Sequence, residues 1–393
     1  AFTLLKFGEA ISPSTGAYCK ARLNLDHEEL QAVFEHSTEV IESQEQRILS
    51  GRRVVVVDGT GLKAADTEEN QEEWPQQKSQ NPGCGFPSLR VCACFLLKTG
   101  AALGYRTGNK KSHELPLFRD MWDLLIEGDI CLGDKGFSSF FDLAMLLVRG
   151  VDSLVTQAAG KRKPIAEADC IKKLGRNDLL VEWKKPAWNN RSSYTKEQWR
   201  TLPETLTLRQ IKVEVRQKGF RVKSFYIITT LLDPVDYPVE ELAELYLRRW
   251  EVELNFDDLK TTMGMDELRC KTPDMVKKEL LMYFIVYNAA RWAINDAAAE
   301  HEVDPMRISF KGALQEIRSW EPQLDSSKLS KAEKRMIIKE LYRGISLRIV
   351  PLRPNRREPR CLKHRPKPYQ LLTKHRHLME EIEHRSKYKA KVA

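Results

Sequence analysis

Two short apolar runs, far apart in the chain, each end in an aspartate. The β-branched run over 54–57 is followed by Asp58, and the run over 130–133 is followed by Asp134. Runs of this length and composition predict buried strands. If the two strands are neighbours in one sheet, both carboxylates face the same edge of that sheet.

Helical and strand patterns fill most of the remaining chain. Strand pairs are predicted over 89–108 and over 209–232, where a hairpin turns at Lys218-Gly219. Helices are predicted within 1–50, near 115–125 and over most of 238–299. The polar stretch 68–85 is expected to be a loop, and the prolines beyond 351 predict an extended tail before a short helix near Leu378. This order of elements predicts an α/β fold, with a mixed sheet flanked by helices and interrupted by a β-rich insertion.

The net charge of +9 is unevenly distributed along the chain. Residues 156–223 hold 17 Lys or Arg against 7 Asp or Glu, and residues 343–393 hold 15 against 4. Two basic segments on an acidic remainder indicate surfaces that bind a polyanion such as nucleic acid, because neutralised phosphates release counterions. The alternative for the second segment is a solubilising, disordered end.

Membrane and secreted classes do not fit the sequence. The longest apolar stretch, near 280–294, contains polar interruptions and is shorter than the roughly 20 residues that a membrane span needs. The first residues show no signal-peptide pattern, and the 8 cysteines form no CxxC pair. These features predict a cytoplasmic protein. Because the chain starts without Met, it is left open whether residues precede Ala1.

Carboxylates that converge on one point are what a phosphodiester enzyme with two metal ions requires, since the ions lie about 4 Å apart and stabilise the attacking and the leaving oxygen. Asp58 and Asp134 qualify because small or flexible residues follow them and leave room for a substrate backbone. An Asp-Gly pair at a strand end is, however, more often a turn.

One helical segment, YLRRWEVELNFDDLK, carries the most specific pattern. At about 100° per residue, a stripe roughly 60° wide holds four polar residues, namely Tyr246, Arg249, Glu253 and Lys260. A carboxylate between two cations fits a metal ligand, Glu253, flanked by groups that grip phosphates. The alternative is a solvated face held by the (i, i+4) pair of Arg249 and Glu253, which leaves Tyr246 unexplained.

The spacing of these four residues, Tyr246-x2-Arg249-x3-Glu253-x6-Lys260, matches the YREK signature of the insertion-sequence-four family of DDE transposases. Other segments resemble that family as well: RVVVVDGTGL resembles the first catalytic strand, LGDKGF the second, and RPKPYQLLTKHRHLM the C-terminal ending. The basic, β-rich stretch lies where the family has its insertion domain. The resemblance covers nearly the whole chain.

The resemblance implies an RNase H-like fold in which Asp58, Asp134 and Glu253 form a catalytic triad that holds two Mg²⁺ or Mn²⁺ ions. Asp257 and Glu251 are rivals for the third carboxylate; on the helical wheel Asp257 lies near the YREK stripe, and Glu251 faces elsewhere. The implied activity is DNA strand cleavage and transfer, by cut-and-paste through a hairpin intermediate. The implied partners are the terminal inverted repeats of an insertion sequence and target DNA, bound by a homodimer at the bacterial nucleoid, with no membrane involved.

The resemblance also divides the chain into five regions. Residues 1–50 are a helical leading segment that belongs to an N-terminal DNA-binding domain. The catalytic core occupies 51–155 and 236–300 on either side of the basic insertion at 156–235. Residues 301–393 form a helical and basic C-terminal region. DNA-binding roles fall to Tyr246, Arg249 and Lys260.

A DNA hairpin requires a displaced base, and an aromatic ring that receives the base lowers the unstacking cost. Related enzymes use a Trp on an inserted strand, just before a short apolar run that ends in Thr. At that place this chain reads FYIITT, so Tyr226 is the first candidate for this DNA contact and Phe225 the second. Three tryptophans of the insertion are further candidates, although a Trp among strand residues more often packs in a core: Trp183, Trp188 and Trp199.

Two other functions fit part of the pattern. A nuclease of the same fold would have the triad but never join DNA, and a DNA-binding relic would keep the basic segments without activity. The complete triad and the complete YREK set favour the transposase.

Overall fold

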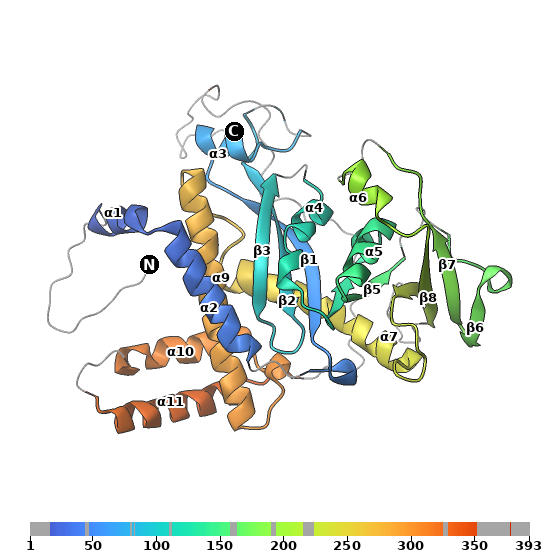
Figure 1. Ribbon diagram of the computed structural model, residues 1–393. Helices are drawn as coiled ribbons and strands as arrows, with labels where there is room; N and C mark the ends of the chain where they lie inside the picture. The colour runs from blue at the N-terminus through green and yellow to red at the C-terminus, as the bar shows by residue number, and fades with distance from the viewer. Residues whose placement is uncertain are drawn as a thin grey trace, which may run out of the picture.

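The computed structural model describes residues 16–43, 47–78, 81, 83–109, 112–157, 163–189, 194–214, 224–324, 329–351 and 378 (Figure 1). Its centre is a nine-stranded sheet with the strand order β3-β2-β1-β4-β5-β9-β8-β7-β6. The strands are β1 (Val54–Lys63), β2 (Ser88–Leu96), β3 (Ala102–Asn109), β4 (Ile130–Gly133), β5 (Asp152–Thr156), β6 (Lys172–Gly175), β7 (Asp178–Lys184), β8 (Thr205–Glu214) and β9 (Ser224–Thr229).

The first five strands have the RNase H-like arrangement that the sequence resemblance implied. Strands β1, β2 and β3 pair antiparallel, and β4 and β5 continue the sheet parallel to β1. The connections pass through helices, with α4 (Glu114–Arg119) before β4 and α5 (Phe140–Val148) before β5. The fold is therefore a mixed α/β sheet flanked by helices.

Each face of the sheet packs against its own hydrophobic cluster. Val54 and Val56 of β1 belong to the cluster under α9 (Pro273–Glu300) and α2 (His27–Glu42), whereas Val55 and Val57 belong to the cluster under α4 and α5. Side chains along a strand point alternately to the two faces. Because both faces are covered, every position of the run 54–57 is apolar.

Several other helices lie at the periphery (Figure 1). They are α1 (Gly16–Asn24), α3 (Glu68–Glu73), α6 (Lys196–Arg200), α10 (Phe310–Leu324) and α11 (Lys331–Ser346). The last two form a hairpin that packs on α9. No helix in the described ranges is both long and apolar enough to cross a membrane.

Strand β1 does not end at Asp58, as the sequence predicted, but continues to Lys63. Its antiparallel pairing with β2 holds the strand as far as Lys63, whereas its parallel pairing with β4 stops at Val56. The polar stretch 68–85 also differs from prediction, since it contains α3, whose first turn is capped by the Thr67 hydroxyl.

The helical region predicted over 238–299 is confirmed, and its interior is irregular. It comprises α7 (Val239–Leu247), a 3₁₀ turn (Arg248–Trp250), α8 (Glu251–Asp257), a π turn (Asp258–Thr262) and, after a break, α9. The break ends at Pro273, where the Thr272 hydroxyl accepts the Met275 N–H and caps α9.

The predicted β-rich stretch adds four antiparallel strands to the same sheet. Strand β9 pairs with β5, and β8, β7 and β6 follow outward. Arg209 of β8, fully buried, binds both carboxylate oxygens of Asp178 and donates to the carbonyls of Asp233 and Tyr237 just before α7. The added strands are thereby connected to the start of the helical segment 239–262. We call this segment the YREK helix because it contains Tyr246, Arg249, Glu253 and Lys260. The limits of the five predicted regions remain predictions. The predicted turn at Lys218-Gly219 lies outside the described residues, and so does the tail beyond 351, apart from Leu378.

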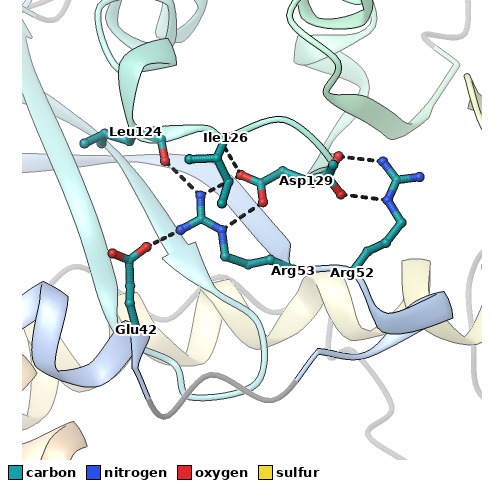
Figure 2. Close-up of polar contacts among 7 residues, drawn as sticks. Glu42, Arg52, Arg53, Leu124, Ile126 and Asp129 are labelled. Atoms are coloured by element: carbon teal, nitrogen blue, oxygen red, sulfur yellow. Dashed lines mark hydrogen bonds and ion pairs between the residues drawn. The ribbon is translucent and has the colours of Figure 1, made fainter.

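A buried ion pair fixes the register of β1 against β4 (Figure 2). The guanidinium of Arg53 donates to both carboxylate oxygens of Asp129, at 2.8 and 2.6 Å, and also pairs with Glu42 of α2. Arg53 and Asp129 stand one residue before the first parallel pair of the two strands. Each also lies five residues before a candidate carboxylate, Asp58 or Asp134. The ion pair therefore holds the register that brings these carboxylates level.

Candidate active site

Asp58 and Asp134 lie side by side on neighbouring strands. Each is two residues beyond the last parallel pair of β1 and β4, Val56↔Leu132. Asp134 keeps an extended backbone, with φ −78° and ψ −177°, so the strand alternation continues through it. Both aspartates thus share the face of Val56 and Leu132, which is the face that the YREK helix covers.

The surroundings of Asp58 disfavour its charged form. Burial, the largest cause, raises the pKa of Asp58 to about 6, and the negative charges of Asp134 and Glu114 act in the same direction. The Gly59 N–H, which donates to Asp58 Oδ1 at 2.8 Å, and the Arg249 guanidinium oppose this shift. Carboxylates crowded in this way gain from a nearby divalent cation.

Glu253 faces Asp58 from α8 across an open pocket of 360 Å³. Half of the Glu253 side chain is exposed, and its Oε1 lies 3.8 Å from Arg249 Nη2. The pocket is lined by Asp58, Gly59, Thr60, Glu253, Phe256, Asp257, Lys260 and Thr261. Two of the three predicted triad members therefore border one pocket, and Asp134 stands beside the first of them.

Tyr246 and Arg249 fill the space between the YREK helix and the sheet. The Tyr246 hydroxyl donates to Thr156 Oγ1 of β5 at 3.0 Å, and burial raises the pKa of Tyr246. Arg249 is 8% exposed, and its guanidinium carbon lies 5.2 Å from the centre of the Trp250 ring. Within the described part of the chain, Nε of Arg249 has no hydrogen-bond partner. A buried guanidinium with an unused donor is suited to receive a phosphate oxygen.

Lys260 reaches the strand of Asp58 from the π turn. Its Nζ donates to Thr60 Oγ1 at 3.1 Å, and Thr60 follows Asp58 by two residues on the same face of β1. The four YREK residues thus contact the sheet, the pocket or each other, although a 3₁₀ turn and a π turn replace the regular helix assumed from the sequence.

The two rival carboxylates of the helix have different surroundings. Glu251 pairs with Arg248, whose Nε donates to Glu251 Oε1 at 2.9 Å, and it does not line the pocket. Asp257 lines the pocket beside Glu253 and accepts a hydrogen bond from Thr261 Oγ1 at 2.7 Å. Asp257 is therefore a second helical carboxylate within the site.

Phe225, and not Tyr226, shares the face of the aspartates. Ile227 of β9 belongs to the cluster on that face, and Ile228 belongs to the opposite cluster. By strand alternation Phe225 lies with Ile227, and Tyr226 lies with Ile228. The Phe225 ring centre is 5.6 Å from that of Tyr246. The sequence indicated an aromatic pair at this place. Which of the two rings lies on the face of the aspartates depends on how β9 pairs with β5.

The tryptophans of the insertion contact other parts of it. Trp183 is 3% exposed within β7, and the Trp199 indole N–H donates to the Pro186 carbonyl at 3.1 Å. The Lys196 ammonium lies 5.7 Å from the centre of the Trp188 ring. These contacts place the three side chains in the insertion and not along the pocket.

The donor chemistry of the site fits Mg²⁺ or Mn²⁺. Carboxylate oxygens are the ligands that these hard cations prefer. Asp58 and Asp134 offer such oxygens from level strand positions, and Glu253 offers them from the helix. Among the described side chains, no three of His, Cys, Asp or Glu are already close enough together to hold one ion.

Two neighbours of the site were missed by the sequence analysis. The Glu114 carboxylate of α4 accepts a 2.6 Å hydrogen bond from Arg90, and a Cβ at position 59 would lie 2.5 Å from it. A side chain at position 59 would therefore require Glu114 to move. Arg291 of α9 binds Asp258 beneath the π turn at 2.8 Å. Both contacts join separate elements, so no local pattern signals them.

The chain is similar to known transposases. The family described as "Transposase DDE domain" matches residues 49–289. The transposase InsG for insertion sequence element IS4 of Escherichia coli (strain K12) is 26% identical over 371 residues, which cover 91% of this chain and 78% of that protein. The putative transposase InsL for insertion sequence element IS186A, from the same organism, is 37% identical over 63 residues, 16% of this chain and 17% of that protein. Among solved structures, a piggyBac transposase synaptic complex with hairpin DNA has a TM-score of 0.40 and 11% identity, over 73% of this chain and 57% of that chain.

The chain belongs to the family of DDE transposases, since the family match spans more than half of its length. As the YREK residues predicted, it is an insertion-sequence DNA transposase of the insertion-sequence-four type. Enzymes of this class cleave DNA strands, transfer them, and depend on divalent metal ions.

Proposed function

We propose that Asp58, Asp134 and Glu253 are the metal-binding triad with which this transposase cuts and joins DNA. The level position of the two aspartates, with Glu253 across the pocket, carries the proposal. Two bound Mg²⁺ or Mn²⁺ ions would supply activation of the attacking oxygen and stabilisation of the leaving oxygen of the phosphodiester.

The remaining YREK residues hold the DNA strand at this triad. Arg249 supplies a positive charge and an unused Nε donor beside Glu253, and Lys260 supplies a second positive charge in the pocket lining. The ring of Tyr246 packs against Arg249, and the ring centre lies 5.9 Å from the guanidinium carbon. Charge on both sides of the scissile phosphate fixes the strand in line for attack.

The DNA partners are the terminal inverted repeats of the element and the target duplex. The basic insertion and the basic C-terminal region supply charge for both. Joining two ends at once requires two active sites, so we expect a homodimer on DNA, acting at the bacterial nucleoid.

Strand joining that depends on Glu253 tests this function. Wild type and Glu253→Ala are incubated with Mg²⁺, a labelled duplex that ends in the element's terminal repeat, and a supercoiled plasmid. We expect hairpin ends and joined products with wild type and neither with the variant, because the helical metal ligand is gone. Glu251→Ala is the matched control and should retain both products, since Glu251 pairs with Arg248 outside the pocket. Cleavage without joining would instead indicate a nuclease, and salt-sensitive binding alone a DNA-binding relic.

The hairpin step is expected to depend on Phe225 more than on Tyr226. Phe225→Ala should lower hairpin yield by about tenfold or more, because stacking of one base on an aromatic ring contributes about 1–3 kcal/mol, while the first nick persists. Tyr226→Ala, on the opposite face of β9, should leave the yield within about twofold of wild type. Both products are quantified on denaturing gels. A larger loss in Tyr226→Ala would restore Tyr226, the first candidate from sequence, as the base-receiving residue.

A further inference from the structure

A buried ion pair fastens the π turn of the YREK helix to α9. Asp258 is the first residue of the turn, and its Oδ2 accepts from Arg291 Nη2 at 2.8 Å. The same nitrogen donates to Asn255 Oδ1 at 3.1 Å in the preceding turn. Arg291 is only 3% exposed. A single buried guanidinium therefore bridges the end of α8 and the start of the π turn.

Arg291 is itself held in one position by a neighbour on its own helix and by two other elements. Its Nε donates to the Tyr287 hydroxyl at 3.0 Å, and this hydroxyl donates to the Gly100 carbonyl, between β2 and β3, at 2.7 Å. The Phe310 ring of α10 lies 5.1 Å from the guanidinium carbon. Gly100 has a φ of +72°, and a Cβ there would come within 3.1 Å of Arg291. These contacts enclose the guanidinium closely. Position 100 requires glycine, because its φ is positive and a Cβ there would crowd Arg291.

The opposite side of the π turn forms the active-site pocket. The turn is closed by the Met263 N–H, which donates to the Asp258 carbonyl at 2.9 Å. Lys260 and Thr261 line the pocket, and Lys260 bonds Thr60 beside Asp58. A turn with i to i+5 bonding accommodates one more residue than an α-helical turn, so it sets the direction in which Lys260 leaves the helix.

We propose that Arg291 and Asp258 are a positioning pair, which holds the π turn in the register that directs Lys260 into the pocket. Neither residue lines the pocket. Only the link from Lys260 to strand cleavage rests on the proposed function. A buried ion pair by itself is weak evidence for stability, since apolar pairs of similar volume often serve as well, so the role that we assign to this pair is geometric.

Chemical reactivity of Lys260 tests the positioning without any DNA. Full-length wild type and Asp258→Asn are exposed to limiting acetic anhydride, and the acetylation rate of each lysine is measured by mass spectrometry. We expect Lys260 to react about tenfold faster in Asp258→Asn, because the ammonium leaves Thr60 and becomes solvated. Lys277, which pairs with Glu73 on the surface, should react at its wild-type rate. Asp142→Asn is the matched control: it breaks another buried carboxylate–arginine pair, with Arg119, on the opposite face of the sheet, and should leave Lys260 unchanged.

Single-turnover cleavage of a terminal-repeat duplex provides the second measurement. We expect Asp258→Asn to lower the rate at saturating DNA by about tenfold or more, with the Kd for DNA within about threefold of wild type. The double variant Asp258→Leu/Arg291→Met, whose apolar side chains keep the volume, should fold and show the same two changes. If Lys260 reactivity and cleavage in Asp258→Asn equal those of Asp142→Asn, the pair is only structural and the proposal is overturned. If Lys260 reactivity rises but wild type itself never cleaves, the positioning stands and the proposed function fails.

Discussion

Asp58→Asn is expected to lower the rate of DNA strand cleavage by about 10³-fold or more, while the protein stays folded and binds DNA. The amide keeps the shape of the side chain but removes the charge that lies level with Asp134. A divalent cation between the two strands would then lose one of its anionic ligands. Single-turnover cleavage of a labelled terminal-repeat duplex in Mg²⁺ measures the loss.

Stability gives this prediction an internal control. The burial and repulsion that raise the pKa of Asp58 to about 6 make its ionised form unfavourable in the folded chain. Stability therefore falls as pH rises from the unfolded-state value toward 6, and Asn at this position avoids that loss at neutral pH. We expect Asp58→Asn to unfold at the same or a higher urea concentration than wild type at pH 7.5. Wild type in EDTA should match the inactivity of the variant. Appreciable cleavage by Asp58→Asn would remove this residue from the triad.

Asp129→Asn is expected to lower the free energy of unfolding by about 3 kcal/mol, because it leaves the buried Arg53 guanidinium with an incomplete set of charged partners. Asp129 is 1% exposed, and its carboxylate also accepts the Ile126 N–H at 2.9 Å. Urea denaturation at neutral pH measures the change through the transition midpoint and its slope.

A surface ion pair provides the control for this second variant. Asp123 lies 3.6 Å from Arg149, its side chain is 94% exposed, and Asp123→Asn should change stability by less than about 0.5 kcal/mol. A loss for Asp129→Asn no larger than this would show that Arg53 and Asp129 do not hold the two strands. If Asp129→Asn loses much stability but its folded fraction cleaves DNA normally, the backbone pairing of β1 with β4 is sufficient to keep Asp58 level with Asp134.

Local patterns in the sequence were sufficient for the strands that carry the aspartates and for the helix that carries the YREK residues. The run 54–57 is apolar because both faces of β1 are buried, and this is visible without knowing its partners. The YREK spacing gave the family because four residues at fixed intervals can be recognised in the sequence itself, whatever turns the helix contains. The α/β class followed from the order of these elements.

Features that depend on contacts between distant segments were not predictable in the same way. The extension of β1 to Lys63 depends on β2, and the choice between Phe225 and Tyr226 depends on the pairing of β9 with β5. The Arg53–Asp129 and Arg291–Asp258 pairs each join positions more than 30 residues apart. Charged residues read from sequence are usually assigned to the surface, and these four are instead largely withdrawn from solvent.

The continuity of the sheet from β3 to β6 has a consequence for the DNA. Because β9 bonds directly to β5, and Arg209 bonds the carbonyls just before α7, the described strands of the insertion continue the sheet of the core. If the basic insertion binds the duplex that the proposed triad cuts, both contacts lie on one continuous sheet, and we expect the bending to come from the nucleic acid. Smooth bending over 20–30 base pairs costs on the order of 1–6 kcal/mol, and less at flexible pyrimidine–purine steps. Element ends with such steps near the cleavage point would be cut faster than equally well bound ends that lack them.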